Sequence, residues 1–483
     1  KSFIRSSIRA GNPPPKNVAL GEFWFSLSEC VHFRDSIAID LIHQWFGQFY
    51  LDIRTFRVYP PGKMEDNMAS IIKRILAKMD EVSQPQQKFL LPLFVTIVVM
   101  RGKVNFRNLS RYSDVNEKTY SRQFRKLFDF VSFNQYLIEE AVETTHEQIG
   151  VMDCSYVPKS GKQTYGLDIF YDSCKNQPAK GLEVSNLVVI DVTDNTGYTL
   201  SSRQTPSQEA LEKMVADGDI TPTSQIEDDE ITRIDFYATH LTEDSSHLPQ
   251  EVRYIVADGY YAKTKFVTAV HHVNRHLISK LRCDANLRYL YTGPQKKKGA
   301  RRKYDGKVKF DDTSRLEYVA QVEPGLHLYT AIVNNVQLKC NIRLVYVQNL
   351  RNRQKPGYAL LFSTDINQDA ITIYRYYKAR FQIEFLFRDA KQFTGLSDCQ
   401  ARCQDSLDFH FNASFTTLNL AKVDAQQNFG LLPNTPFSMA TQKRVYFNEH
   451  LLQRFIAVLA LDPTLVINNP ELQQLTMYGA IAA

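Results

Sequence analysis

Two aspartates follow apolar segments at positions where their carboxylates could hold a metal ion. Asp153 comes after the apolar residues 149–152, and Asp258 comes after the largely apolar segment 252–257. We expect both segments to be strands, and a strand end would hold each carboxylate rigidly at the rim of a sheet. Mg²⁺ prefers oxygen ligands and usually takes one or two carboxylates with water and substrate phosphate. Two such ions about 4 Å apart can activate an attacking hydroxyl and stabilise the leaving oxygen of a phosphodiester.

A third acid belongs to a more specific pattern, which combines a hydroxyl, an acid and two cations. The pattern has offsets of 0, 3, 7 and 14 and consists of Tyr377, Arg380, Glu384 and Lys391. At roughly 100° per residue, these positions fall within an arc of about 60° on one helix face. This arrangement suits a metal ligand flanked by phosphate-binding groups. An arginine can grip a phosphate through two parallel hydrogen bonds, and a lysine supplies a point charge.

Each of these features also has a simpler structural interpretation. A single aspartate at a strand end more often caps a turn than binds a metal. A helix face with mixed acids and bases is common, although it does not explain Tyr377 at this spacing. Cys399, Cys403 and His410 could be drawn as part of a zinc site. They lack a fourth ligand at a suitable spacing, which favours ordinary core or surface thiols.

The order and spacing of the motifs resemble the DDE transposases of bacterial insertion sequences, in particular the family-four group with a Tyr-Arg-Glu-Lys signature. The helix motif matches the pattern Tyr-x2-Arg-x3-Glu-x6-Lys. Asp153-Cys154-Ser155 resembles the first Asp motif of that group, and residues 256–261 resemble the second. Segments 180–185 and 279–287 are similar to the strands that follow these motifs. The resemblance covers about residues 147–420.

The resemblance implies a ribonuclease-H-like catalytic core, interrupted by a β-rich insertion ahead of the helix that carries Glu384. It implies that Asp153, Asp258 and Glu384 are catalytic and bind two Mg²⁺ ions, for which Mn²⁺ can substitute. It also implies that Tyr377, Arg380 and Lys391 contact phosphates of the transposon ends or of a DNA hairpin.

One departure concerns the aromatic residue on which some relatives stack a flipped base. That residue is a tryptophan in the insertion, whereas the two tryptophans of this chain, Trp24 and Trp45, lie far outside it. Any aromatic face can stack a base, and the candidates in the insertion are Tyr318, Tyr329 and Tyr346. The hairpin route therefore stays open, while metal-dependent cleavage does not depend on it.

Hydrophobic periodicity predicts an α/β protein in which a mixed sheet is flanked by helical regions. Further strands are expected at 182–191 and 197–203, and a β meander at 316–321, 326–334, 336–347 and 358–364. A buried helix is expected at 86–100 and a single helix from about 368 to 393. The predicted division is a helical DNA-binding region (1–146), the first part of the core (147–284), the β-rich insertion (285–366), the second part of the core (367–420) and a helical C-terminal region (421–483).

Basic residues are concentrated in two segments, which fit two surfaces that face phosphates. The first contains Arg101, Lys103, Arg107, Arg111, Lys118, Arg122, Arg125 and Lys126. Two short helices at 105–112 and 116–128, the second capped by Asn116 and carrying the last four of these cations, suggest a helix-turn-helix. The second segment is a loop at 296–309 that would follow the DNA backbone through Lys296, Lys297, Lys298, Arg301, Arg302 and Lys303. Either segment by itself could equally be a solvated loop.

The composition is that of a globular intracellular protein. Apolar residues make up 43%, and the net charge of +6 is too mild by itself to imply nucleic acid. The seven cysteines include no Cys-x-x-Cys pair, and their odd number argues against a disulfide framework. The longest apolar run, 89–100, is too short to span a bilayer, and the chain opens with no secretory signal. We therefore expect a cytoplasmic, nucleoid-associated bacterial protein.

These observations favour a transposase that cuts the ends of its element and joins the freed 3′ hydroxyls to target DNA. Its partners would be double-stranded DNA, both inverted-repeat ends and target, and a second copy of the chain, because two ends must be cut together. One alternative is a ribonuclease-H-like nuclease or resolvase that cuts without joining. Another is a domesticated, transposase-derived DNA-binding protein, against which the presence of all three carboxylates argues. A small-molecule or membrane enzyme has no support in the sequence.

Overall fold

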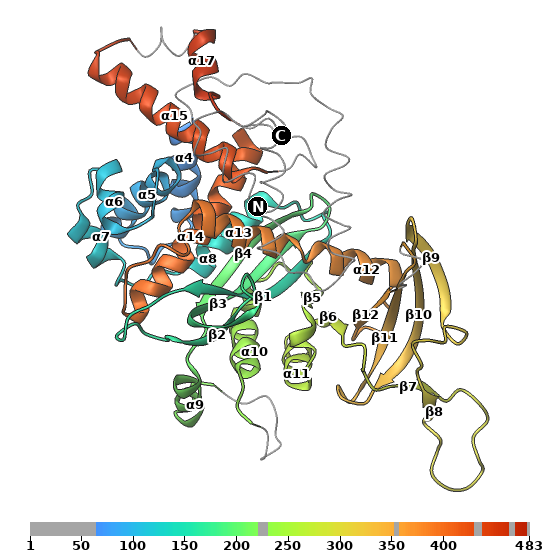
Figure 1. Cartoon of the computed structure of the whole chain (residues 1–483). Helices are drawn as coiled ribbons and strands as arrows, with labels where there is room; N and C mark the ends of the chain where they lie inside the picture. Colours follow the sequence, from blue (N-terminus) through green and yellow to red (C-terminus); the bar gives the residue numbers. More distant parts are fainter. Residues whose placement is uncertain (1–63, 221–229, 352–356, 429–436, 463–468, 481–483) are drawn as a thin grey trace, which may run out of the picture.

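The computed structural model describes residues 64–220, 230–351, 357–428, 437–462 and 469–480. Residues 1–63 of the predicted N-terminal DNA-binding region lie outside these ranges. Figure 1 shows a large mixed sheet at the centre, with helices on both of its faces at one end. The chain is therefore a mixed α/β protein, as predicted.

One half of the sheet carries the predicted aspartates and is built from β1 (Gln148–Pro158), β3 (Gln177–Asp191), β4 (Thr196–Gln204), β5 (Tyr254–Ala257) and β6 (His276–Leu281). The strand order here is β4-β3-β1-β5-β6. Strands β1, β3 and β4 are antiparallel neighbours, whereas β5 is parallel to β1 and β6 is parallel to β5. The short strand β2 (Asp168–Asp172) also pairs with β3.

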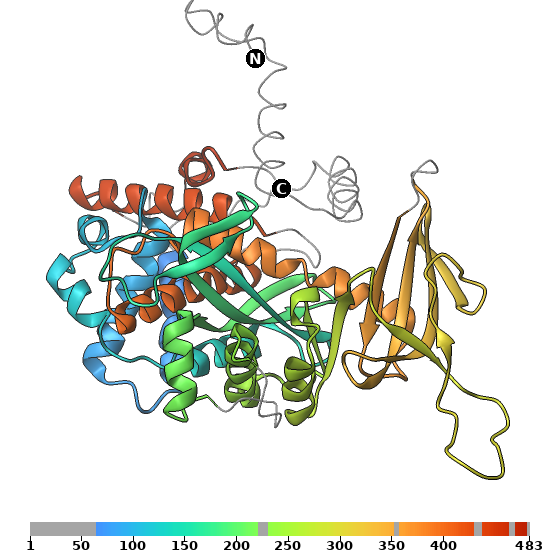
Figure 2. The ribbon, with the colours of Figure 1, turned by 60° about the horizontal axis from the view of Figure 1, so that its bottom comes forward.

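The other half of the sheet is the β-rich segment that the sequence predicted as an insertion. It consists of β7 (Leu287–Leu290), β8 (Tyr304–Lys307), β9 (Glu317–Glu323), β10 (Leu326–Asn335), β11 (Cys340–Asn349) and β12 (Gly357–Ser363). Strands β9 to β12 form the predicted meander. Strand β12 pairs with β6, so the meander extends the sheet that carries the aspartates. Figure 2 shows that this half projects away from most of the helices.

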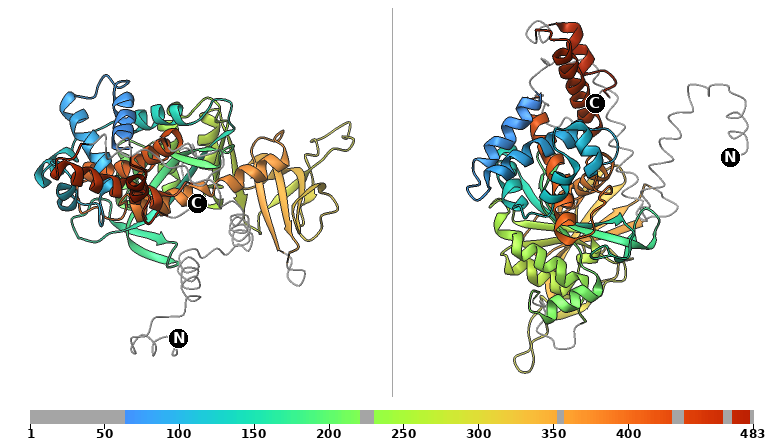
Figure 3. Two further views of the ribbon diagram at one scale, coloured as in Figure 1. Left: turned by 90° about the horizontal axis from the view of Figure 1, so that it is seen from above. Right: turned by 90° about the vertical axis from the view of Figure 1, so that its left-hand side faces the viewer.

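Helices cover both faces of the aspartate-bearing half, because β3 is fully buried from Gly181 to Asp191 and must be shielded on both sides. One face is covered by α8 (Phe130–Ala141), α13 (Gln382–Phe393) and α14 (Gln404–Asn428), and the other by α10 (Arg233–Asp244) with α11 (Thr264–His272) beside it. The short α9 (Gln208–Ala216) lies on the second side. The two views in Figure 3 show the same layering.

The N-terminal helices pack against the C-terminal ones. The described elements are α4 (Met64–Leu76), α5 (Gln84–Val99), α6 (Phe106–Tyr112) and α7 (Glu117–Gln123), followed at the end of the chain by α15 (Met439–Val458) and α17 (Pro470–Thr476). Helix α5 contacts α4, α6, α14 and α15. It is the predicted buried helix, with eight buried residues from Phe89 to Val99. The described helices α4 and α5 therefore pack with α15 in one helical layer beside the sheet (Figure 3).

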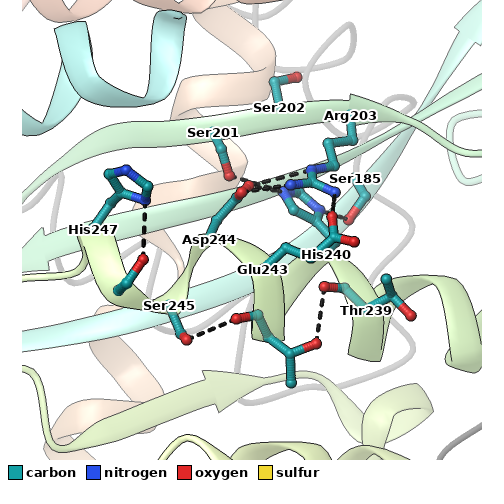
Figure 4. A network of polar contacts seen from close by, with 12 residues as sticks. Ser185, Ser201, Ser202, Arg203, Thr239, His240, Glu243, Asp244, Ser245 and His247 are labelled. Carbon is teal, nitrogen blue, oxygen red and sulfur yellow. Dashed lines mark hydrogen bonds and ion pairs between the residues drawn. The ribbon is translucent and has the colours of Figure 1, made fainter. Parts of the chain in front are cut away.

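A buried polar network fixes α10 on the sheet (Figure 4). His240 is fully buried and lies between Ser185 of β3, whose Oγ is 2.9 Å from Nδ1, and Ser201 of β4, whose Oγ is 2.8 Å from Nε2. Asp244, one turn along α10, pairs with both His240 and Arg203. Because these buried groups satisfy one another, helix and sheet are held in one orientation.

Four sequence-based expectations about element bounds were wrong. Strand β1 continues to Pro158 instead of ending at Asp153, because β3 supplies hydrogen-bond partners as far as that residue. The expected turn at 334–335 falls after Asn335, with Lys339 in a left-handed conformation at φ 56°. Helix α7 ends at Gln123 instead of 128. The single helix expected at 368–393 is two helices, α12 (Ala370–Ala379) and α13.

The break between α12 and α13 is a local tightening of the helix. The amide of Phe381 bonds to the carbonyl of Lys378, and the amide of Glu384 bonds to the carbonyl of Phe381, each three residues back. Such 3₁₀-type bonds wind the chain more tightly than the usual four-residue spacing. The angular positions of Glu384 and Lys391 relative to Tyr377 therefore differ from those of one straight helix.

Candidate active site

Asp153 and Asp258 are side by side because the strands that carry them are parallel and in register. The last residue pair shared by β1 and β5 is Met152 with Ala257, and each aspartate follows immediately. Neighbouring strands lie about 4.8 Å apart, so the two carboxylates start from adjacent points of the sheet. Strand β5 ends here while β1 continues, which leaves one edge of β1 open beside Asp153.

The chain turns sharply after Asp258, and the turn fixes its carboxylate. Oδ1 of Asp258 accepts a hydrogen bond from the amide of Tyr260 at 2.8 Å, at the start of a short 3₁₀ helix, Gly259–Tyr261. A Cβ at Gly259 would lie 3.0 Å from the carbonyl oxygen of Lys280. Glycine therefore allows this turn to approach β6 closely, where Ser279 Oγ donates to the carbonyl of Asp258 at 2.7 Å.

Arg380 joins the helical part of the site to the sheet. Its Nη1 donates to Oδ2 of Asp153 at 2.8 Å, and its Nη2 donates to Oε1 of Glu384 at 3.3 Å. The guanidinium is only 11% exposed, whereas the Glu384 side chain is 41% exposed. The amide of Cys154 donates to the other oxygen of Asp153 at 2.8 Å, so both oxygens of this carboxylate are engaged.

The pKa values of Asp153 and Arg380 reflect the charged groups that lie close to them. Burial raises the pKa of Asp153 well above its usual range; Arg380 opposes this shift, and the charges of Asp258 and Glu384 reinforce it. For Arg380, burial lowers the pKa of the guanidinium, but Tyr377, Asp153 and Glu384 outweigh burial and raise it overall. Two carboxylates thus contact one buried arginine, and the charge of the third, Asp258, also acts on it. Their excess negative charge and their all-oxygen donor set fit a divalent cation of the Mg²⁺ type.

The remaining members of the predicted helix stripe also lie beside β1. Lys391 Nζ donates to Ser155 Oγ at 2.8 Å, and Ser155 is two residues beyond Asp153. The ring centroid of Tyr377 is 5.8 Å from the guanidinium carbon of Arg380. The structure therefore brings together all six residues that the sequence placed at the site, although the helix that carries four of them is broken.

A different group comes closest to a preformed metal site in this structure. Among the described residues, only His146, Asp191 and Asp194 bring three ligand atoms within 4.8 Å of one another. They lie near the start of β1, where Gln148 pairs with Asp191, whereas Asp153 lies in the middle of the same strand pair, opposite Asn186. Asp153, Asp258 and Glu384 do not form such a group, because Arg380 lies between Asp153 and Glu384.

Hydrogen bonds within the protein account for the arrangement of His146, Asp191 and Asp194. His146 Nδ1 is 2.7 Å from Oδ2 of Asp191, and the other oxygen of Asp191 accepts from the amides of Thr193 and Asp194 at 2.9 and 3.0 Å. Asp191 thus caps the turn between β3 and β4 and pairs with a histidine. The hydrogen bond that Asp191 accepts from His146 raises the pKa of the histidine, and burial opposes this shift only in part.

The predicted DNA contacts outside the centre form two separate exposed surfaces. Asn116 caps α7 through a 2.9 Å bond to the amide of Thr119, as expected. The cations at Lys118, Arg122, Arg125 and Lys126 are all exposed. The cations of the β7–β8 loop are exposed as well, namely Lys296, Lys297, Lys298, Arg301, Arg302 and Lys303. In Figure 1, α7 and this loop lie at opposite ends of the sheet.

The three candidate base-stacking tyrosines form a row across β9, β10 and β11. The ring centroids of Tyr318 and Tyr329 are 5.4 Å apart, and those of Tyr329 and Tyr346 are 6.1 Å apart. Tyr346 is 4% exposed, whereas Tyr318 is 51% exposed. Of the three, Tyr318 offers the most accessible ring face.

One feature that the sequence did not reveal is a basic cavity next to Lys391. It has a volume of about 420 Å³ and lies between the loop after α5, the end of α13 and the start of α15. Arg101 and Lys103 belong to a segment whose basic character was evident, but Lys443 and Arg444 carried no signal. No local pattern could have linked residues so far apart in the chain.

Comparison with known families agrees with the two aspartate motifs. Residues 107–331 match the family model described as DDE superfamily endonuclease, which supports a DDE-type transposase or nuclease family. Such nucleases act on DNA and generally use divalent metal ions. The matched segment includes Asp153 and Asp258, whereas Glu384 lies beyond its end. A search of curated proteins gives no significant match. Within the described ranges, no helix has the length and apolar character needed to cross a membrane.

Proposed function

We propose that this chain is a DNA transposase of the family-four type, with Asp153, Asp258 and Glu384 as its metal ligands. The observation that carries the proposal is that Arg380 bonds to both Asp153 and Glu384, while Asp258 lies beside Asp153 at the end of the adjacent parallel strand. The strand order β4-β3-β1-β5-β6, with β5 and β6 parallel to β1, supports a ribonuclease-H-like core. On such a core, β7 to β12 would be the insertion of the predicted domain division.

The donor set fits two Mg²⁺ or Mn²⁺ ions, which when bound would activate the attacking hydroxyl and stabilise the leaving oxygen. Asp153 and Asp258 would supply rigid ligands, because backbone amides already orient one oxygen of each. Glu384, whose side chain is 41% exposed, would complete the set from the helical side. Water, and afterwards a DNA hydroxyl, would be the nucleophile, so no covalent protein–DNA intermediate is needed.

The charged neighbours would position the DNA. Arg380 would turn from the carboxylates toward a phosphate of the transposon end, with Tyr377 and Lys391 contacting the phosphates beside it. The exposed cations of α7 and of the turn after it would bind the inverted repeat, and those of the β7–β8 loop would follow the backbone. Because both ends of an element must be cut together, the active species would be a dimer on DNA.

The metal assignment is tested with Glu384→Gln, which removes one negative ligand and keeps the side-chain size. We expect loss of Mn²⁺-dependent DNA cleavage by at least about a hundredfold, with DNA binding nearly unchanged. Glu251→Gln is the matched control, because Glu251 is exposed in the turn before β5. Cleavage at the wild-type rate by Glu384→Gln would remove Glu384 from the ligand set.

Because the matching family is described as an endonuclease, a second candidate function is that of a nuclease that cuts DNA without joining it. A transposase joins a 3′ hydroxyl of DNA to target DNA, whereas such a nuclease does not. A DNA duplex with a pre-cut end and a supercoiled target plasmid are incubated with the full chain and Mn²⁺. A covalently joined product supports the transposase, whereas cleavage with no joined product supports the nuclease.

A further inference from the structure

The basic cavity beside the active site contains an unusual excess of positive charge. Its lining includes five cationic side chains, from Arg101, Lys103, Lys391, Lys443 and Arg444. Among the residues that the structure describes, the one acid in this lining is Asp398. Oδ2 of Asp398 accepts a 2.9 Å hydrogen bond from the amide of Val104, so part of its charge is already engaged. The cavity is therefore suited to an anion.

The loop that carries Arg101 and Lys103 is held in place by backbone hydrogen bonds. Asn108 Nδ2 donates to the carbonyl of Arg101 at 2.9 Å and to that of Lys103 at 3.0 Å. Gly102 between them has φ +83°, a conformation that other residues rarely adopt. The guanidinium carbon of Arg101 lies 4.3 Å from the ring centroid of Phe447. The two cations thus extend from a fixed loop.

The opposite wall of the cavity is also held in place by hydrogen bonds to backbone carbonyls. Lys443 Nζ donates to the carbonyls of Ile97 and Phe393 at 2.7 and 2.8 Å, which ties α15 to the ends of α5 and α13. Arg444 donates to the carbonyl of Gly479. These bonds give Lys443 a structural role, and because their acceptors are neutral carbonyls, they do not themselves offset the positive charge of the cavity.

Lys391 connects the cavity to the catalytic carboxylates. It lines the cavity, and its Nζ is 2.8 Å from Ser155 Oγ, two residues along β1 from Asp153. A chain of phosphates that passes the carboxylates would therefore meet Lys391 next and the cavity after it. Regularly spaced negative charge is what a nucleic acid strand presents.

We propose that this cavity binds the phosphates of the DNA strand next to the bond that is cut, with Arg101 and Lys103 as its outer contacts. The proposal rests on DNA being the substrate, as argued above. It assigns these two residues a role separate from the exposed cations of α7. The contact between the N-terminal and C-terminal helices would then serve DNA binding, because both groups of helices are needed to form the cavity.

The test compares two double variants that change the charge equally. Arg101→Glu/Lys103→Glu alters the cavity, and Lys175→Glu/Lys213→Glu alters exposed residues of the β2–β3 turn and α9. All four side chains are exposed, so both proteins should fold, which circular dichroism verifies. Binding of a fluorescent DNA duplex of arbitrary sequence is measured by anisotropy with the full chain in EDTA, over a range of salt concentrations.

We expect the cavity variant to bind DNA about tenfold more weakly or worse, with a salt dependence reduced by roughly two counterions. The control should stay within about twofold of the wild type. Equal affinities for the two variants would overturn the proposal. Cleavage by the wild type in Mn²⁺ is measured separately, so absence of cleavage would count against the transposase and leave the binding comparison interpretable.

A second measurement locates the contact directly. The full chain is treated with an amine-acetylating reagent with and without saturating duplex, and acetylation is quantified by mass spectrometry. Lys103 should be protected several-fold by DNA, whereas Lys213 should react equally in both samples. Unchanged acetylation of Lys103 at saturation would show that DNA does not cover the cavity.

Discussion

Arg380 donates a 2.8 Å hydrogen bond to Asp153, although 227 positions separate the two residues in the chain. This contact places a buried cation among the acids proposed to bind metal. An arginine in this position offsets part of their mutual repulsion, which would otherwise be large in a partly desolvated site. The same guanidinium is suited to a phosphate once the carboxylates have another partner.

We therefore predict that Arg380 opposes metal binding in the absence of DNA. Arg380→Gln should bind Mn²⁺ about tenfold more tightly or better, because one positive charge close to the carboxylates is removed. The same variant should lose DNA cleavage, because it lacks the phosphate contact. Mn²⁺ binding is followed by electron paramagnetic resonance. Arg375→Gln is the control, since Arg375 is exposed on α12 and pairs with Glu147. Weaker Mn²⁺ binding by Arg380→Gln would contradict the prediction.

A second prediction distinguishes the two acidic groups of the core. Asp258→Asn should abolish tight Mn²⁺ binding, because it removes one of the two rigid ligands at the strand ends. His146→Gln should leave Mn²⁺ binding unchanged, since Asp191 already caps a turn and pairs with the histidine. Calorimetric titration of both variants with Mn²⁺, without DNA, shows which of the two acidic groups binds the ion. The reverse outcome would assign the metal site to the group with His146, near the start of β1.

The sequence predicted the residues of the site better than their geometry. The apolar segments before Asp153 and Asp258 identified two strands, but the register of β1 with β5 depends on pairing between distant residues. For the same reason Asp153 was expected at a strand end, although β3 extends the pairing beyond it. Nonlocal pairing leaves little trace in local periodicity.

The shorter elements were harder to predict for different reasons. The break at Arg380 and Phe381 involves no glycine or proline, so no local signal marks it. Strands β7 and β8 have four residues each, and β8 contains Gly306 at φ +90°. The basic cavity combines segments separated by more than 300 residues, because Arg101 and Lys443 meet only in the folded chain.

A third prediction concerns the stability of the fold as a function of pH. The hydrogen bond that His146 donates to Asp191 raises the pKa of the histidine above its usual value of about 6.5. The pair therefore stabilises the folded state fully below about pH 6.5, and this stabilisation is lost as pH rises through the higher pKa of the folded state. His146→Gln should cost on the order of 1 kcal/mol at low pH and much less at high pH.

Urea unfolding at about pH 5.5 and pH 8.5 measures this difference for the wild type and the variant. The exposed His272 on α11 provides the control, and His272→Gln should cost little at either pH. A cost for His146→Gln that is the same at both pH values would show that the pair does not depend on a protonated histidine.

The last prediction follows from Lys443 in the basic cavity. Burial, together with the smaller effect of the Arg101 charge, lowers the pKa of Lys443 to about 7, although Asp398 opposes the shift. Lys391 and Arg444 line the same cavity and add positive charge. Bound phosphate would favour the protonated amine, so DNA affinity should fall as pH rises from about 6 to 8. Lys443→Met removes the titrating group and should therefore bind DNA more weakly than the wild type at low pH.

The DNA affinities of the wild type and Lys443→Met should become equal at high pH, because the wild-type amine is then largely neutral. Lys443→Arg provides the complementary test, since a guanidinium stays charged throughout this range and should bind DNA with little dependence on pH. Anisotropy in EDTA at constant ionic strength measures all three proteins, with circular dichroism to verify folding. If the wild type and Lys443→Arg show the same pH dependence, Lys443 does not titrate in contact with the DNA, and the cavity holds the strand through its permanently charged groups alone.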